Sequence, residues 1–451
     1  MYLLLLLIIV ILFLLLASVE SSQKRRVRRI RIEREEDCTD KPFILDGRCV
    51  EDCPSFINEN NIDCIDYIPE GKYLLGNKIV SKCPMYYTNT RLCGYPKAEF
   101  VSSVISNDGK YKTLITRDGI VVSFNGLEWC VYNHSNNIKN VSKLLSNDTG
   151  NKQLVMTLNG VFISTDYGKT WSLLLPQNVK VIDVDMSADG IITLIIDRSV
   201  NSTEKIRNVE VYKEDGTTML VKSFINILIT QISIGKFQSS NFTNYFAVLR
   251  AEDNKCFIIK SIFENDRFNS SNSQLNNTFI INFYYSFDDI RTEPYEGEAI
   301  TYIEMSKNGR FIYVITKENK PMGRCYLYTG LVLGPAPNSN VYLYRSNIDV
   351  GNLVYMKSSY HGKNNIGIVY NQNTKSEYLL NFDIVYNEEI VYGNPLLVSA
   401  RLNTDIRGLC DAISVSRDQN QENDGKYNLA CLSNGEIIES KNYGMTFETM
   451  K

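Results

Sequence analysis

One local pattern constrains the fold of this chain more than any other feature of its sequence. In its most complete copy, at residues 164–171, it has the form Ser-x-Asp-x-Gly-x-Thr-Trp. An Asp side chain accepts hydrogen bonds from backbone amides of its own turn, and Gly supplies the positive φ that such turns need. A closing Trp is a large apolar group that packs between sheets. The pattern predicts a tight turn between two strands, followed by an aromatic anchor.

Weaker copies of the pattern occur elsewhere and share its surroundings. One lies at residues 440–447, and a shortened one lies at residues 123–129. Each copy follows an apolar strand, an Asp-Gly or Asn-Gly turn and a second apolar strand, at residues 112–123, 153–164 and 427–440. Such dipeptides between β-rich runs are strong hairpin signals. Repeated units of short strands predict a β-propeller.

A second recurring turn supports the same architecture. It appears as Ser-Asn-Asp-Gly at 106–109, Ser-Ala-Asp-Gly at 187–190 and Ser-Lys-Asn-Gly at 306–309. Residues 96–451 divide into six or seven blades, at about 45–55 residues per blade, a little above the usual propeller repeat. We therefore predict an all-β fold, a six- or seven-bladed propeller preceded by a small disulfide-rich module. A pair of β-sandwiches is the alternative.

The copies resemble the Asp box, or bacterial neuraminidase repeat, of sialidase and sortilin-like β-propellers. In those families the box stabilises a hairpin away from the catalytic or ligand face, so the resemblance implies a fold and no chemistry. It assigns structural roles to the following residues: Ser164, Asp166, Gly168, Trp171, Ser440, Asn442, Gly444, Phe447 and Trp129.

The N-terminal segment predicts a secretory compartment. Residues 2–17 are almost entirely apolar, which is short for a membrane span and typical of a signal peptide over residues 1–22. No basic residue precedes this run and seven follow it between Lys24 and Arg34, so an uncleaved type II anchor is the alternative. Residues 23–36 form a basic linker or a pro-segment, since residues 26–29 resemble a furin-type processing site.

Cysteines dominate the next segment, residues 37–95. It has few apolar runs, so three disulfides would supply its stability; fifteen pairings are possible. The segment loosely resembles furin-like and protist surface cysteine-rich proteins, and it lacks the His and Cys-x-x-Cys of a zinc module. Two further cysteines flank a hairpin expected in the last blade and are predicted to pair. The cysteines assigned to disulfides are Cys38, Cys49, Cys53, Cys64, Cys83, Cys93, Cys410 and Cys431.

Seven Asn-x-Ser/Thr sequons agree with a secretory route. They predict glycosylation at Asn133, Asn140, Asn147, Asn201, Asn241, Asn269 and Asn276.

The sequence contains few residues that could support catalysis, metal binding or nucleic-acid binding. The Arg-Ile-Pro signature of sialidases is absent, and the nearest catalytic candidate is the loop Arg291–Glu298, which combines Arg, Tyr and carboxylates. The two histidines, His134 and His361, stand far apart. A net charge of −3 gives no reason to expect nucleic-acid binding. We predict no catalytic, cofactor-binding or metal-binding residue.

The sequence therefore predicts a secreted or luminal glycoprotein whose propeller binds a protein or glycan partner without catalysis. Sortilin-type receptors resemble it in using an Asp-box propeller for ligand capture, although their cysteine-rich module follows the propeller. A sialidase-like glycoside hydrolase is one alternative. A structural coat protein, cross-linked through the odd one of eleven cysteines, is another.

Overall fold

The structure is a computed structural model. It describes residues 100–449 apart from short gaps, the longest of which are 261–277, 333–340 and 386–396, together with short strands between residues 43 and 80. The predicted signal and basic segments, and the side chains of the six cysteines in the predicted disulfide-rich module, lie outside the described residues. In the described part of the chain, no helix has the length and apolar character needed to cross a membrane.

The chain divides into two compact units, residues 1–53 and 54–451. In the first unit, β1 (Phe43–Leu45) pairs with β2 (Arg48–Val50) in an antiparallel hairpin. The second unit begins with a small sheet in the order β4-β3-β6-β5. Its strands are β3 (Phe56–Ile57), β4 (Cys64–Ile65), β5 (Tyr73–Leu75) and β6 (Lys78–Val80).

The rest of the second unit consists of seven sheets, or blades, each built on four antiparallel strands that are consecutive in the chain. Blade 1 contains β7 (Phe100–Ile105), β8 (Tyr111–Thr116), β9 (Ile120–Asn125) and β10 (Trp129–Asn133). Blade 2 contains β11 (Val141–Ser146), β12 (Gln153–Thr157), β13 (Gly160–Ser164) and β14 (Ser172–Leu173). Blade 3 contains β15 (Val181–Met186), β16 (Ile192–Asp197), β17 (Ile206–Tyr212) and β18 (Thr218–Ile225). Blade 4 contains β19 (Ile229–Gln238), β20 (Thr243–Ala251), β21 (Cys256–Ile259) and β22 (Thr278–Ile280).

The remaining blades follow the same plan with one addition. Blade 5 contains β25 (Glu298–Met305), β26 (Phe311–Glu318), β27 (Cys325–Leu331) and β28 (Tyr342–Arg345). Its outer edge is extended by β23 (Asn282–Ser286), which pairs in parallel with β28, and by β24 (Asp289–Arg291). Blade 6 contains β29 (Leu353–Ser358), β30 (Asn364–Asn371), β31 (Ser376–Val385) and β32 (Leu397–Arg407). Blade 7 contains β33 (Leu409–Val415), β34 (Asn428–Leu432), β35 (Ile437–Ser440) and β36 (Glu448–Thr449).

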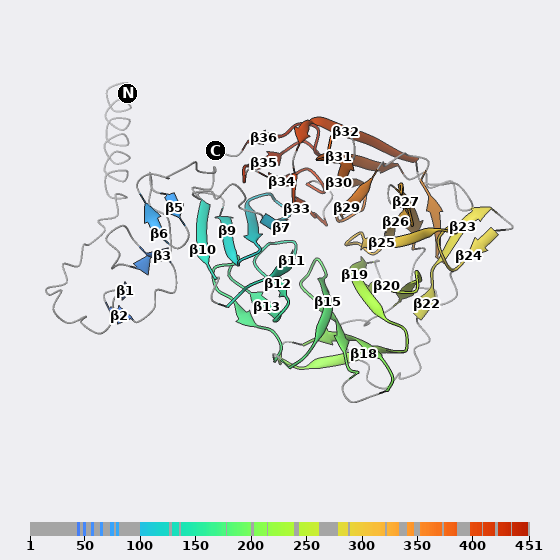
Figure 1. Ribbon diagram of the computed structural model, residues 1–451, viewed down its shortest axis with the longest axis horizontal. Coiled ribbons are helices and arrows are strands. Elements are labelled where there is room, and N and C mark those ends of the chain that lie inside the picture. Colours follow the sequence, from blue (N-terminus) through green and yellow to red (C-terminus); the bar gives the residue numbers. More distant parts are fainter. Residues whose placement is uncertain are drawn as a thin grey trace, which may run out of the picture. The chain divides into compact units, whose positions relative to one another are not determined.

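The blades follow one another in chain order around a ring, which brings blade 7 beside blade 1 (Figure 1). The ring closes through apolar packing, because Phe100 and Leu114 of blade 1 share a buried cluster with Leu429 and Ile437 of blade 7. No strand of blade 1 or blade 7 is exchanged between them in the described residues. The predicted all-β propeller is confirmed, with seven blades.

Alternation along the strands builds the core between blades. On β16, Leu194 and Ile196 pack toward blade 2, whereas Ile195 packs toward blade 4, and all three are fully buried. Successive side chains of a strand point to opposite faces of the sheet, so one strand serves two interfaces. Burying each such side chain contributes about 1.5–3 kcal/mol to the stability of the fold.

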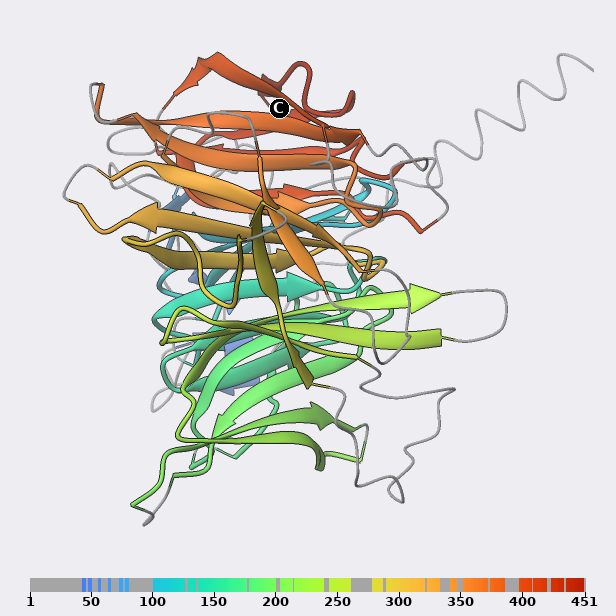
Figure 2. The ribbon, with the colours of Figure 1, turned by 90° about the vertical axis from the view of Figure 1, so that its right-hand side faces the viewer.

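In a side view the hairpin of β19 and β20 extends further than the strands beside it (Figure 2).

The turn at residues 164–171 joins β13 to β14 and is held by its own side chains. The Asp166 carboxylate accepts hydrogen bonds from the backbone N–H of Thr170 at 2.9 Å and from its hydroxyl at 2.6 Å. Ser164 Oγ donates to Asp166 at 2.8 Å, and Gly168 has a φ of 83°. The indole N–H of Trp171 donates to the Gly168 carbonyl at 3.0 Å, which ties the aromatic ring to the turn.

The turn at residues 440–447 repeats this arrangement between β35 and β36. The backbone N–H of Thr446 donates to Asn442 Oδ1 at 3.0 Å, and that of Gly444 donates to Ser440 Oγ at 2.9 Å. Phe447 packs against the apolar cluster between blades 6 and 7. The shortened copy is described only in part, because residues 126–128 and the side chain of Trp129 lie outside the described residues.

Four of the five cysteines of the propeller fall into two groups. Cys431 on β34 is fully buried, and the pairing of Leu409 with Leu432 places Cys410 on the adjacent strand. The side chain of Cys410 is not among those described, so this disulfide stays a prediction. Cys256 and Cys325 are buried thiols outside any disulfide. Burial raises the pKa of the Cys256 thiol to about 12, which makes it unreactive.

Replacing Asp166 tests the stabilising role of the first turn. We expect Asp166→Ala to lower the free energy of unfolding by about 1–2 kcal/mol, because several hydrogen bonds to one carboxylate are lost. Asp118→Ala is a matched control in the β8–β9 turn, where the described structure shows no hydrogen bond to the Asp118 carboxylate; we expect a change within about 0.5 kcal/mol. Urea denaturation measures both, and equal effects would contradict the assignment.

Candidate functional site: the central channel

The first strand of each blade lies innermost, and together these strands line a central channel. At the end where the inner strands begin, the channel opens into a cavity of about 1020 Å³, which we call the mouth. Side chains from six inner strands line it, among them Ser102, Lys143, Asp183, Gln231, Glu304 and Lys357. The mouth is therefore a composite site that exists only in the closed ring.

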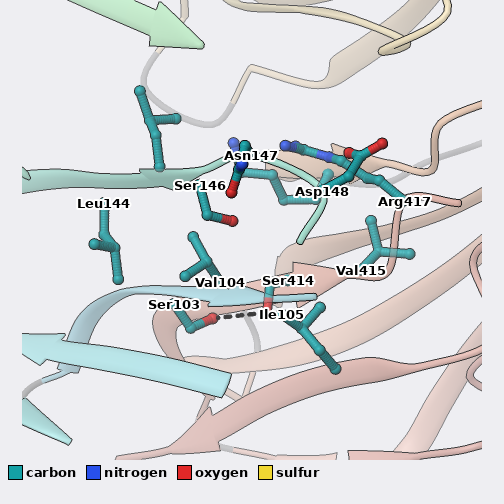
Figure 3. Close-up of a pocket in the computed structure, with 12 residues that line it drawn as sticks. Ser103, Val104, Ile105, Leu144, Ser146, Asn147, Asp148, Ser414, Val415 and Arg417 are labelled. Carbon is teal, nitrogen blue, oxygen red and sulfur yellow. Dashed lines mark hydrogen bonds between the residues drawn. The ribbon is translucent and has the colours of Figure 1, made fainter. Parts of the chain in front are cut away.

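Neutral side chains link several neighbouring inner strands. Ser102 Oγ accepts a hydrogen bond from the Leu144 N–H at 3.1 Å, which joins blades 1 and 2. Ser233 Oγ accepts from the Met305 N–H at 2.9 Å, which joins blades 4 and 5. Ser103 and Ser414 bond at 3.2 Å and join blades 7 and 1 (Figure 3). Each short polar side chain spans a gap that no backbone hydrogen bond of a β-ladder crosses.

Two carboxylates of β15 make the links on either side of blade 3. The Lys143 ammonium donates to Asp183 at 3.0 Å and to the Val184 carbonyl at 2.7 Å. The other oxygen of Asp183 accepts from the Ile232 N–H of blade 4 at 2.9 Å. Lys143 and Asp183 therefore link blades 2, 3 and 4.

Asp185 and Lys307 form a fully buried ion pair deeper in the channel. Asp185 accepts from the Lys307 ammonium and from the Ile234 N–H, each at 2.8 Å. Burial by itself would raise the pKa of Asp185, but Lys307, Lys143 and the Ile234 N–H together hold it well below its usual range. Asp185 is therefore ionised throughout the physiological range and is unsuited to act as a general acid.

Glu304 joins blades 5, 6 and 7. Its carboxylate accepts a hydrogen bond from the Tyr302 hydroxyl at 2.7 Å. Lys357 of blade 6 and Arg417 of blade 7 lie 3.7 and 3.6 Å from it. The Tyr302 hydroxyl is also within 3.0 Å of the Met356 carbonyl. Each carboxylate of the inner strands described here thus has a cation and a second donor, so these groups hold the ring together.

Backbone hydrogen bonds connect the turns at the other end of the channel. The Asn107 N–H donates to the Asp148 carbonyl at 2.7 Å, and the Asp148 N–H donates to the Ala188 carbonyl at 2.8 Å. The Lys236 N–H donates to the Lys307 carbonyl at 2.7 Å. These bonds bring the turns of successive blades together, so the channel is narrow at this end. A small pocket of about 20 Å³ lies beside it, lined mainly by residues of blades 1, 2 and 7.

The loop between β33 and β34 also contributes to this narrow end. Asp424 accepts from the backbone N–H groups of Tyr360 at 2.6 Å and His361 at 2.9 Å. The Gln419 side chain donates to Gln238 of blade 4 at 2.7 Å. Because blades 7 and 4 lie on opposite sides of the ring (Figure 1), this contact spans the narrow end.

Asp148 is an acidic residue at the narrow end with a raised pKa. It lies beside Arg417 in the small pocket (Figure 3), and its Oδ1 is buried with no hydrogen-bond partner in the described structure. Burial raises the pKa of Asp148 to about 7, although Arg417 and Lys307 oppose the shift. Asp148 therefore titrates near neutral pH.

The residues considered for sialidase-like catalysis lie away from the channel. Arg291 is exposed on β24 at the outer edge of blade 5 and pairs with Asp289 at 2.7 Å. Glu298, at the end of the loop Arg291–Glu298, is buried and lies 3.9 Å from Arg345 of β28, and Glu296 is exposed on the loop between β24 and β25. The structure thus separates these side chains from the charged groups of the channel.

The channel residues are absent from the predictions made from the sequence, although two patterns in the sequence indicate them. Otherwise apolar inner strands carry polar residues two apart, as in Asp183 and Asp185 or Tyr302 and Glu304. The second position of the turn after the inner strand carries the other signal. It is Lys307 in the turn at 306–309, and it is Asp148 and Arg417 in the corresponding turns at 147–150 and 416–419.

Comparisons with known proteins give similarity of fold only. No family model matches the chain, and no curated protein matches it. The β-propeller domain of Cps50 (Swd1) from Myceliophteria thermophila is 12% identical over 76% of this chain and 97% of that chain, with a TM-score of 0.47. Hsv2 from Kluyvelomyces marxianus is 11% identical over 78% and 98%, with a TM-score of 0.42. Hydrazine synthase from Kuenenia stuttgartiensis is 12% identical over 82% and 99%, with a TM-score of 0.47.

The titration of Asp148 predicts a pH-dependent stability. The pKa of this group is about 7 in the folded chain and 3.8 as the ordinary value, so the folded state holds a proton that the unfolded chain releases. The free energy of unfolding therefore falls as pH rises between these values. We expect Asp148→Asn to raise Tm by roughly 2–4 °C near pH 8.

The difference should shrink as the pH is lowered to about 5, where Asp148 of the native chain is protonated. Thermal unfolding at both pH values, with Asp118→Asn as an exposed control, makes the comparison. A Tm difference that does not depend on pH would contradict the assignment.

Proposed function

We propose that this chain is a secreted or luminal glycoprotein whose propeller binds a protein or glycan partner at the mouth of the channel, without catalysing a reaction. The observation that carries the proposal is the asymmetry of the channel. Its mouth is a cavity of about 1020 Å³, whereas the turns at its other end are joined to one another by backbone hydrogen bonds. A partner has room at one face of the ring.

The chemistry of the rim supports recognition of a macromolecular partner. Leu158 and Val354 are 81% and 55% exposed, and both line the mouth. Arg250 lines the same rim and donates a hydrogen bond to the Thr301 carbonyl at 2.8 Å. Exposed apolar side chains beside an arginine are common in protein-binding surfaces.

The state of the channel carboxylates favours binding over hydrolysis. A glycosidase needs one protonated and one ionised carboxyl group on either side of the scissile bond. Asp183, Asp185 and Glu304 instead bond to cations and to backbone or hydroxyl donors. A sialidase-like hydrolase remains an alternative, which release of sugar in the experiment below distinguishes, and a cross-linked coat protein is the other alternative.

Apolar residues 2–17 and the sequons support the secretory route. Asn140 and Asn147 are the sequon residues with described side chains. Asn140 is exposed, whereas Asn147 is half-buried in its turn. Asn147 donates to Asn151 at 2.8 Å and accepts from the Lys152 N–H at 3.2 Å. A glycan on Asn147 would disrupt this turn.

We therefore expect a glycan on Asn140 and none on Asn147 in protein recovered from a secretory host. Mass spectrometry of peptides released before and after deglycosylation reads the occupancy of each site. Full occupancy of Asn147 would contradict the structural reasoning, and an unmodified chain at every sequon would contradict the secretory proposal.

The binding proposal is tested with the purified chain on immobilised glycans and in pull-downs from the same compartment. We expect Val354→Asp to weaken retention of the partner at least tenfold, about 1.4 kcal/mol, because a charge enters the mouth rim. Leu220→Asp is the matched control, since Leu220 is also 55% exposed but lies on β18. Equal loss in both variants, or release of sugar from the glycans, would contradict the proposal.

A further inference from the structure

A second hollow lies on blade 2 and shares a wall with the mouth. It is a groove of about 770 Å³ around the β12–β13 turn, bordered by the segments that lead into blades 2 and 3. Leu158 lines both the groove and the mouth. The groove has a different chemistry from the charged channel and therefore suits a different ligand.

Three asparagine side chains line the groove. Asn137 precedes β11, Asn159 lies in the β12–β13 turn, and Asn178 precedes β15; all three are exposed. In the described structure none of their side-chain amides forms a hydrogen bond. Each amide offers two donors and an accepting oxygen, which matches the mixed donor and acceptor character of a hydroxyl group.

Trp171 gives the groove an aromatic wall. Part of its ring packs against the apolar cluster between blades 1 and 2, and the side chain also lines the groove with Leu173, which is 39% exposed. Its N–H is already bonded to the Gly168 carbonyl at 3.0 Å. The ring can therefore offer a ligand its apolar surface, in an orientation fixed by the turn at residues 164–171.

The groove is almost free of charge. Among the described residues that line it, Lys180 alone is charged, and its ammonium lies 3.1 Å from Asp197. An anionic or cationic ligand would find no unpaired counter-charge here. A ligand with hydroxyl groups and apolar C–H faces would find partners for both.

We propose that this groove binds a neutral oligosaccharide. The amides of Asn137, Asn159 and Asn178 would bond its hydroxyl groups, and the Trp171 ring would contact the C–H face of one sugar ring. Apart from Leu158, the residues that line this groove differ from those that line the mouth, so the proposal does not depend on the partner proposed there. It also gives the tryptophan of the turn a role in recognition besides its packing.

Intrinsic fluorescence tests the proposal, because the chain has two tryptophans, Trp129 and Trp171. In Trp129→Phe, all tryptophan emission comes from Trp171. We expect one or more neutral oligosaccharides of glucose, mannose or N-acetylglucosamine to change this emission saturably and to protect it from acrylamide quenching. Should Trp129→Phe not fold, saturation-transfer difference NMR of the native chain shows whether the same oligosaccharides bind.

Matched variants locate the site. We expect Asn137→Ala and Asn178→Ala each to weaken oligosaccharide binding at least fivefold, about 1 kcal/mol. Asn319→Ala, which removes an exposed amide on blade 5, and Val354→Asp at the mouth should leave it unchanged. No binding by the whole panel, or binding that Asn137→Ala and Asn178→Ala leave intact, would overturn the proposal. Loss of a polypeptide partner in these two variants, with no oligosaccharide bound, would overturn it as well.

Discussion

The fold requires hydrogen-bond partners for the backbone groups on the inward edges of the seven innermost strands. In the described structure each of these strands pairs with one neighbour only, the second strand of its own blade. Their other edge faces the channel, where an unpaired N–H group is costly. Asp183 and Asp185 accept from Ile232 and Ile234, and Ser233 accepts from Met305. A side chain of one blade thus completes the backbone of the next.

This constraint explains why a charged channel need not be an active site. A buried ion pair need not stabilise a fold, because taking two charges out of water is costly. Removing only one partner of such a pair, however, typically lowers the free energy of unfolding by about 3–5 kcal/mol. Asp185 and Lys307 are fully buried, so each depends on the other. The exposed side chains of Leu158 and Val354 lie at the mouth. The channel therefore separates structural charges within it from the rim that a partner can reach.

Features that depend on interactions between residues close in sequence could be predicted. Turn chemistry at residues 164–171 and 440–447 depends on side chains bonding to their own backbone, so spacing alone predicts the hairpins and, by repetition, the propeller. It did not predict the channel, because Asp183 becomes an inward residue only when seven blades close a ring. Nor did it resolve β23 and β24, since β23 pairs with β28, about 60 residues further along the chain, and β24 pairs with β23. The groove beside Trp171 was missed for the same reason: Asn137 and Asn178 meet it from different connecting segments.

The central claim is that buried channel carboxylates bind the blades together, and a double-mutant cycle on Asp185 and Lys307 tests it most directly. Urea denaturation would compare Asp185→Asn, Lys307→Met and the double variant with the native chain. If the pair joins the blades, each single change lowers the free energy of unfolding by about 3–5 kcal/mol and the double change by much less than their sum. Additive effects, or single changes of less than about 0.5 kcal/mol, would contradict it.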